Sequence, residues 1–358
     1  MYLFSMLKAS CFKHTLNFRS PSGTSRGVLA TKESWFIKLW DTDNEKVVGI
    51  GECSLIEGLS LDAVQEFELI LTEICRSIDL LGTDNSIEDL NLLCWPSIAF
   101  GLELAFLDLQ YEGKKTFDNA FVEGDEISIN GLIWMGEKSF MKEQIDEKLE
   151  AGFSCIKLKI GAINFDEELS LLKYIRDQYS RGIIEIRVDA NGAFSCEEAL
   201  DKLKRLSDFD LHSIEQPIRP GQHEEMAKLC EYSPLAIALD EELIGAFDSN
   251  MKMKLLNEVR PQYIVLKPSL HGGFSGADDW ISNAEALNVE WWATSALESN
   301  IGLNGIAQWL HGYKNKMPQG LGTGHLFTNN IGSPLFVSNG KLGYSSKGSW
   351  DLSLFNIE

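Results

Sequence analysis

The sequence predicts an α/β fold, in which parallel strands close into a barrel that follows an α+β region. From about residue 126, short β-branched runs that end in polar or glycine residues alternate with helical stretches. Strand–helix alternation at this pace is typical of a parallel sheet with right-handed crossovers. Residues 1 to about 118 show a different pattern, with strand-like runs first and helical patterns after them. A doubly wound open sheet is the alternative to the closed barrel.

The first 118 residues are expected to form an α+β lobe. Strand-like segments cover residues 33–43 and 46–55. The polar segment 18–32 contains Pro21, Gly23 and Gly27, which predict a loop with turns or mobility. Apolar residues at helical spacing predict helices over 61–81 and 95–113, and Pro96 suits the first turn of the second helix.

The barrel is expected to contain about eight strands. Six runs carry the strand pattern, at 154–161, 185–192, 212–218, 235–243, 262–270 and 290–299. One further run at each end, at 127–136 and 319–327, completes the count.

Polar residues stand at the ends of successive strands at nearly constant intervals. They are Lys157 and Lys159, Asp189, Glu215, Asp240, Lys267 and Ser295. The separations from Lys159 onward are 30, 26, 25, 27 and 28 residues, each about one strand–helix unit. The carboxyl ends of parallel barrel strands ring one mouth, so these side chains are expected to converge there. Each short motif alone is ordinary, but five in register indicate a site.

The three carboxylates predict a divalent cation. Asp189, Glu215 and Asp240 would repel one another and raise each other's pKa unless a cation balanced them. Oxygen ligands without His or Cys favour Mg²⁺ over Zn²⁺. Lys159 precedes the carboxylates in strand order and Lys267 follows them. A lysine beside a dication and another lysine loses its proton more easily, so this arrangement suits removal of a proton from a carbon next to a carboxylate.

Composition narrows the class of partner. The chain has 32 basic and 53 acidic residues, and the net charge of −21 argues against nucleic acid or an anionic membrane surface as partners. The seven cysteines are scattered and never form a CxxC pair, which indicates reduced thiols and a cytoplasmic location. No stretch approaches the ~20 apolar residues of a membrane span. The sequence leaves the oligomeric state open.

The motif series resembles the enolase superfamily, specifically its muconate-lactonising branch. The motifs are K-x-K, D-A-N-G, E-Q-P, D-E and L-K-P, and the similarity covers nearly the whole chain. "GIGECS" (49–54) and "FGLELAFLDL" (100–109) resemble that family's capping domain, and "SALESNIGL" (295–303) its seventh-strand motif. Through "SGTSRGVL" (22–29) and "GLGTGHLF" (320–327), the chain is most similar to the o-succinylbenzoate synthase family within the branch.

The resemblance implies a (β/α) barrel of the modified TIM type at 119–330. It also implies an N-terminal α+β capping domain at 1–118 that is completed by 331–358. The implied reaction is the Mg²⁺-dependent syn-dehydration of 2-succinyl-6-hydroxy-2,4-cyclohexadiene-1-carboxylate through an enediolate, in menaquinone biosynthesis. Mn²⁺ is the implied substitute metal.

The resemblance also assigns roles to single residues. Asp189, Glu215 and Asp240 are the implied metal ligands, with Glu241 as the alternative to Asp240. Lys159 would remove the α-proton and then help hydroxide leave, and Lys267 would stabilise the enediolate as a cation. The supporting residues would be Lys157, which tunes Lys159 by like-charge proximity, and Asn191, which supports the metal's surroundings. Residues 20–27 would close over the substrate, and the expected substrate contacts include Ser295, Thr323, Asn191, Thr24 and Arg26.

Other members of the branch remain alternatives. Dipeptide epimerases place a D-x-D pair at the eighth strand, whereas this chain has Gly322-Thr323-Gly324, which argues against an ammonium-bearing substrate. N-acylamino acid racemase and muconate cycloisomerase activities remain open. A non-catalytic barrel that binds a small carboxylate is the alternative of another class, and the retention of both Lys159 and Lys267 argues against it.

Overall fold

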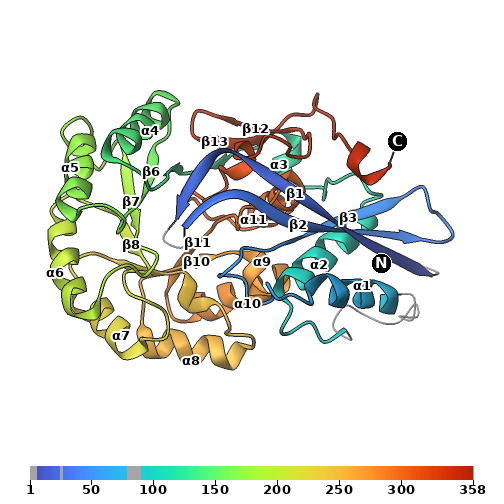
Figure 1. Ribbon diagram of the computed structural model, residues 1–358, viewed down its shortest axis with the longest axis horizontal. Helices are drawn as coiled ribbons and strands as arrows, with labels where there is room; N and C mark the ends of the chain where they lie inside the picture. Colours follow the sequence, from blue (N-terminus) through green and yellow to red (C-terminus); the bar gives the residue numbers. More distant parts are fainter. Residues whose placement is uncertain (1–5, 25–26, 79–89, 358) are drawn as a thin grey trace.

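The N-terminal part of the chain is an antiparallel sheet with two helices. The computed structural model describes residues 6–24, 27–78 and 90–357. The sheet has the order β1 (Leu7–Thr24), β2 (Gly27–Asp41), β3 (Val48–Ser54), and it is followed by α1 (Phe67–Ile78) and α2 (Pro96–Gln110). Figure 1 shows this sheet in blue, running from the middle of the molecule to its right side above α1 and α2. The predicted α+β arrangement of strands followed by helices in this region is therefore confirmed.

The loop predicted over residues 18–32 is mostly strand, so that prediction was wrong. β1 and β2 continue past Asn17 as a hairpin, with Ser22 opposite Leu29 and Thr24 opposite Gly27, and the register shifts between Asn17 and Ser22. Antiparallel pairing satisfies the backbone groups of a segment whose proline and glycine content indicated turns. Local composition did not reveal the partner strand.

Helix α2 packs directly on β3. A Cβ atom on Gly51 would lie 1.7 Å from the carbonyl oxygen of Gly101, and a Cβ atom on Gly49 would lie 2.0 Å from that of Ala105. Such distances leave no room for a side chain, so "GIGECS" and "FGLELAFLDL" need glycine where the strand and the helix touch. α2 is apolar on nearly all sides because it is also covered by α9 (Pro268–His271) and α10 (Gly273–Ala286).

The second sheet contains seven parallel strands. Its order is β11 (Glu290–Ala293), β10 (Tyr263–Leu266), β9 (Ile237–Leu239), β8 (Ser213–Glu215), β7 (Glu185–Asp189), β6 (Cys155–Lys159), β5 (Gly131–Ile133). The strands follow one another in sequence order around the sheet, and all six predicted runs from 154 to 299 contain one of them. The sheet is therefore parallel with sequential crossovers, as the sequence predicted.

The eighth predicted strand is reduced to bridges that join the two edges of the sheet. Gln319 bridges Ile129, near β5, and Gly320 bridges Thr294, which follows β11. The two edges thus meet at residues 319–320, as an α/β barrel requires. The run at 127–136 is split, because β4 (Ile127–Ser128) pairs with a C-terminal strand and only β5 pairs with β6.

Helices surround the parallel strands. They are α4 (Lys138–Glu150), α5 (Phe165–Arg176), α6 (Cys196–Ser207), α7 (His223–Tyr232), α8 (Ser249–Val259), α10 and α11 (Asn300–His311). In Figure 1, α4 to α8 follow the outer edge of the molecule in sequence order. α6 begins with a capping box between Ser195 and Glu198, which satisfies the first backbone N–H groups of the helix. Apolar residues from the helices and strands form one large core, which includes Phe36 and Phe100 of the N-terminal part.

The C-terminal residues contact both parts of the chain. β12 (Leu335–Ser338) and β13 (Lys341–Tyr344) form a small sheet with β4. Phe355, in the 3₁₀ turn Ser353–Phe355, packs edge-on against Phe36 of β2, with ring centroids 5.2 Å apart. The domain boundaries at 118 and 331 remain predictions. No helix in the described ranges is long and apolar enough to cross a membrane.

Candidate active site

The strand ends bring the predicted polar residues to one rim. In the register of the parallel sheet, Lys159 lies opposite Asp189, and Asp189 lies opposite Glu215. Asp240 follows β9 directly and begins the 3₁₀ turn Glu241–Leu243. Short strands of buried residues end at the mouth, where Asp189 is the last residue of β7 and Asp240 directly follows β9.

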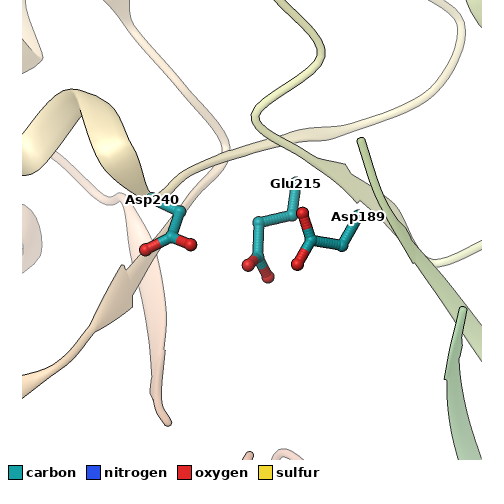
Figure 2. A group of neighbouring side chains, drawn as sticks. All are labelled: Asp189, Glu215 and Asp240. Carbon is teal, nitrogen blue, oxygen red and sulfur yellow. The ribbon is translucent and has the colours of Figure 1, made fainter. Parts of the chain in front are cut away.

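Three carboxylates converge there. Asp189, Glu215 and Asp240 each offer an oxygen atom, and these oxygen atoms lie within 4.8 Å of one another. Figure 2 shows Asp189 and Glu215 side by side, with Asp240 approaching from the other side. All three side chains are almost fully buried, at 1%, 2% and 1% exposure. Buried carboxylates without His or Cys match the donor set of a hard divalent cation, so the residues fit Mg²⁺.

Three lysines contact these carboxylates. The Nζ atom of Lys157 donates to both carboxylate oxygens of Glu215, at 2.7 and 2.6 Å. Lys159 donates to Oδ2 of Asp189 at 2.9 Å, and Lys267 donates to the carboxylate of Asp240. Lys159 and Lys267 therefore lie on opposite sides of the carboxylate group, as the strand order predicted. Lys157 is paired more deeply, between Glu215 and Asp189.

The carboxylates differ in the direction of their pKa shifts. Burial raises the pKa of Asp189, but the ammonium groups of Lys157 and Lys159 outweigh it and hold this pKa well below its usual range. Burial and the neighbouring Asp189 raise the pKa of Glu215 well above its usual range. Burial would lower the pKa of Lys267, yet attraction to Asp240 and Glu241 raises it. The cluster thus concentrates opposite charges that stabilise one another only in close contact.

Asn191 joins two sides of the site. Its Oδ1 atom accepts a hydrogen bond from Lys159 Nζ at 2.7 Å, and its Nδ2 atom donates to Oε1 of Glu241 at 3.0 Å. The residue has a left-handed backbone, with φ +43°, in the turn of "DANG". Glu241 is therefore turned toward Asn191, and the three converging carboxylates include Asp240 rather than Glu241.

Ser295 and Thr323 lie together at the end of β11. Thr323 donates its hydroxyl hydrogen to Ser295 Oγ at 2.8 Å, and Ser295 donates to Glu298. Ser269 also donates to Glu298, which is fully buried. Burial raises the pKa of Glu298, although the two serine hydroxyls lower it. The hydroxyl hydrogens expected to meet substrate are thus engaged within the protein, and their substrate contacts remain predictions.

The other predicted substrate contacts are Thr24 and Arg26. Thr24 is the last residue of β1, and its backbone pairs with Gly27. Arg26 lies outside the described residues. The substrate contacts of both residues therefore remain predictions.

Sequence reasoning missed several buried residues that organise the site. Gln216 accepts hydrogen bonds at Oε1 from the backbone N–H groups of Asp240 and Glu242, and so fixes the turn after β9. Glu52 and Glu298 are fully buried. Each lies inside a motif that resembles the family: "EQP", "GIGECS" and "SALESNIGL". An acid or amide inside an otherwise apolar or glycine-rich run is the sequence signal that could have indicated these buried polar side chains.

Comparison with known proteins identifies close and distant relatives. The family model for "Enolase C-terminal domain-like" proteins matches residues 140–347, more than half of the chain. An o-succinylbenzoate synthase of Desulfotalea psychrophila is 48% identical over 95% of this chain and 100% of its own length. The crystal structure of MenC from Desulfotalea psychrophila LSv54 matches with a TM-score of 0.81 at 44% identity, covering 95% of this chain and all of that one.

Relatives with other activities are more distant. The L-Ala-D/L-Glu epimerase of Bacillus subtilis is 22% identical over 82% of each chain. A muconate lactonizing enzyme from Pseudomonas fluorescens has a TM-score of 0.82 at 21% identity, covering 99% of this chain and 100% of its own. At this level of identity the likeness concerns the fold.

Proposed function

The chain belongs to the enolase C-terminal domain-like family, as the motif series predicted, and we propose that it catalyses the o-succinylbenzoate synthase reaction. The observation that carries this proposal is the near full-length similarity to a synthase, together with lysines on both sides of three converging carboxylates. The protein is then a lyase. Its substrate is a small carboxylate, 2-succinyl-6-hydroxy-2,4-cyclohexadiene-1-carboxylate, and its product is the aromatic acid of menaquinone biosynthesis.

Asp189, Glu215 and Asp240 would hold Mg²⁺, or Mn²⁺ in its place. Their oxygen-only donor set and their burial support this assignment. When bound, the ion supplies positive charge that offsets the negative charge developing on the substrate carboxylate. Gln216 keeps the backbone of Asp240 in place through the hydrogen bond from the Asp240 N–H group, at 3.1 Å. Asn191 keeps Glu241 turned aside from the carboxylate group.

Lys159 moves the proton. Neutral Lys159 takes the α-proton of the substrate as the α C–H bond breaks, and its ammonium form then gives that proton to the departing hydroxide, so that water leaves and the ring becomes aromatic. The base and the acid are the same group on one face, which suits a syn elimination. Asn191 Oδ1 lies 2.7 Å from Lys159 Nζ and orients it through both steps. Lys267, across the carboxylate group, remains a cation and stabilises the enediolate.

The eighth-strand segment distinguishes dehydration from dipeptide epimerisation. It contains Gly322, Thr323 and Gly324, without the acid pair that would attract an ammonium group. A Cβ atom on Gly324 would lie 2.8 Å from Oδ1 of Asn300, so the position is crowded for an aspartate. This supports a substrate whose distal group is an anion.

The remaining assignments follow from this proposal. The parallel barrel is of the modified TIM type, with the capping domain at 1–118 and 331–358. A cytoplasmic location is supported by seven cysteines that form no disulfide.

Turnover of 2-succinyl-6-hydroxy-2,4-cyclohexadiene-1-carboxylate, called the precursor below, tests the proposal. The purified protein with Mg²⁺ should consume the precursor, which is followed as loss of its enol chromophore, and should release one o-succinylbenzoate per molecule consumed. The matched comparison is an N-succinylamino acid and Ala-Glu under the same conditions. Faster turnover of Ala-Glu than of the precursor would refute the synthase assignment.

A further inference from the structure

A second buried polar cluster connects the N-terminal sheet to the loop after β11. Its centre is Glu52 of β3, which is fully buried and accepts four hydrogen bonds. Oε1 accepts from Ser34 Oγ at 2.8 Å and from the Ser299 N–H group at 2.9 Å. Oε2 accepts from Ser299 Oγ at 2.6 Å and from the Gly302 N–H group at 3.0 Å. A residue of the N-terminal sheet therefore caps the first turn of α11.

The cluster also carries its own counter-charge. Lys32 is 5% exposed, and its Nζ atom donates to Ser34 Oγ at 2.8 Å, which in turn donates to Glu52. Burial lowers the pKa of Lys32, while Glu52 and Glu298 raise it and partly offset the effect. Four hydrogen-bond donors and a nearby lysine thus surround the buried Glu52 side chain, so its polar atoms have partners.

The loop that Glu52 fixes has a strained backbone. Leu297 has a left-handed φ of +62°, which is unfavourable for a leucine and persists only where neighbours hold it. On one side of Leu297, Ser54 of β3 donates to the carbonyl oxygen of Ala296 at 3.1 Å. On the other side, Ser299 is held by Glu52. β3 thus clamps the loop at both flanks of its strained residue.

The clamped loop carries Ser295, which is expected to contact substrate, and residues that hydrogen-bond to it. Ser295 and Glu298 belong to it, and Thr323 is bonded to Ser295. The Leu297 side chain packs with Leu16, Phe18 and Phe327 in a separate apolar cluster between the hairpin and the barrel end. A shift of the loop would therefore move Ser295, with its hydrogen bonds to Glu298 and Thr323, together with the apolar contacts of Leu297.

We propose that Glu52 is a positioning residue for substrate binding. Its carboxylate couples the seating of the N-terminal sheet to the conformation of the loop 295–299, and so sets the subsite for the succinyl arm. The proposal rests on the proposed function in taking that arm as the group bound there. In the described structure none of Glu52's hydrogen bonds goes to Asp189, Glu215 or Asp240, so we expect the effect on binding rather than on the chemical step.

Glu52→Gln tests the proposal with a matched control. Glutamine has nearly the same shape, but its NH₂ group would face N–H donors that now meet a carboxylate oxygen. The control is Glu103→Gln. Glu103 of α2 accepts from the N–H groups of Phe274 and Ser275, so it also joins the N-terminal part to the start of a barrel helix, α10, away from the 295–299 loop.

Steady-state kinetics and product binding give the first measurement. Glu52→Gln should raise KM for the precursor and the Kd of o-succinylbenzoate by about tenfold, and leave kcat within about twofold, because uniform binding is lost. Glu103→Gln should lower Tm comparably and leave KM and Kd unchanged. Equal changes in both variants, or a lower Tm without a change in KM in Glu52→Gln, would overturn the proposal.

Amide hydrogen exchange gives a measurement that needs no substrate. Glu52→Gln should accelerate exchange of the backbone amides of residues 295–302, and Glu103→Gln should not. Unchanged exchange in Glu52→Gln would overturn the positioning role. If wild-type protein neither turns over the precursor nor binds the product, the proposed function fails, and accelerated exchange in Glu52→Gln alone would still support the coupling between β3 and the loop.

Discussion

Lys157 and Lys159 reach the same oxygen atom. Their Nζ atoms lie 3.1 and 2.9 Å from Oδ2 of Asp189. The two lysines are two residues apart on β6, so their side chains leave the strand on the same side. The two ammonium groups therefore lie close together, and the tuning of Lys159 by Lys157 that the family resemblance implied remains a prediction. Asp189 thus links both lysines to the carboxylate group.

Replacing Asp189 should weaken metal binding. Asp189→Asn removes one anionic oxygen ligand and should raise the Kd of Mg²⁺ by roughly one to two orders of magnitude. Isothermal titration calorimetry without substrate measures this directly. The control is Asp201→Asn, because the Asp201 side chain is 82% exposed. This variant should bind Mg²⁺ with the Kd of wild type. An unchanged Kd in Asp189→Asn, or full turnover after exhaustive chelation, would contradict the metal assignment.

The two lysines that flank the carboxylates should differ in dehydration. Lys159→Ala should lower kcat for the precursor by about 10²–10⁴-fold, the usual contribution of a general acid–base group, with the far-UV spectrum unchanged. Lys267→Arg keeps a cation opposite Lys159 and should retain measurable dehydration, whereas inversion of an N-succinylamino acid needs proton transfer on both faces and should stop. Equal rates for wild type and Lys159→Ala would remove the assigned base.

An acid at position 322 should repel the succinyl arm. A Cβ atom on Gly322 would meet Ile129 and Asn130 at 3.5 and 3.6 Å, which are ordinary contacts, so Gly322→Asp tests charge without crowding. We expect kcat/KM for the precursor to fall by about tenfold, corresponding to about 1.4 kcal/mol, while Ala-Glu is tolerated better. Gly322→Asn is the neutral control, and its kcat/KM for the precursor should fall less. An equal fall of kcat/KM in the two variants would show that the size of the new side chain, not its charge, causes the effect.

Stability should depend on pH through His212. Burial, with a smaller contribution from Arg187, lowers the pKa of His212 to about 4 from 6.5. Between these values the unfolded chain binds a proton that the folded chain does not, so stability is present above pH 6.5 and is lost as pH falls toward 4. His212→Phe keeps a ring against Tyr263, 4.8 Å away, and removes the titration. Urea unfolding at pH 7 and pH 5 should show that the free energy of unfolding falls less in His212→Phe than in wild type. An equal fall in both proteins would refute the assignment of the pH dependence to His212.

The sequence by itself determined the parallel strands, the order of the polar residues at their ends and the family. These features are local or periodic. The alternation of strand and helix sets the sheet, and one strand–helix unit between Lys159, Asp189, Glu215, Asp240 and Lys267 brings them to one mouth in a parallel barrel. Asp240, preferred to Glu241 from the family's D-E pattern, converges with Asp189 and Glu215 because it directly follows β9, and its role as a metal ligand remains a prediction.

The tertiary structure decided the features that depend on partners distant in the sequence. Residues 22–24 became strand because Gly27–Leu29 pair with them, and residues 319–320 make bridges in place of the strand predicted at 319–327. Glu52 meets Ser299 across 247 positions of the chain. Neither periodicity nor composition encodes which buried donor meets which acceptor, because that choice is made when the sheets and helices pack and every buried polar group must find a partner.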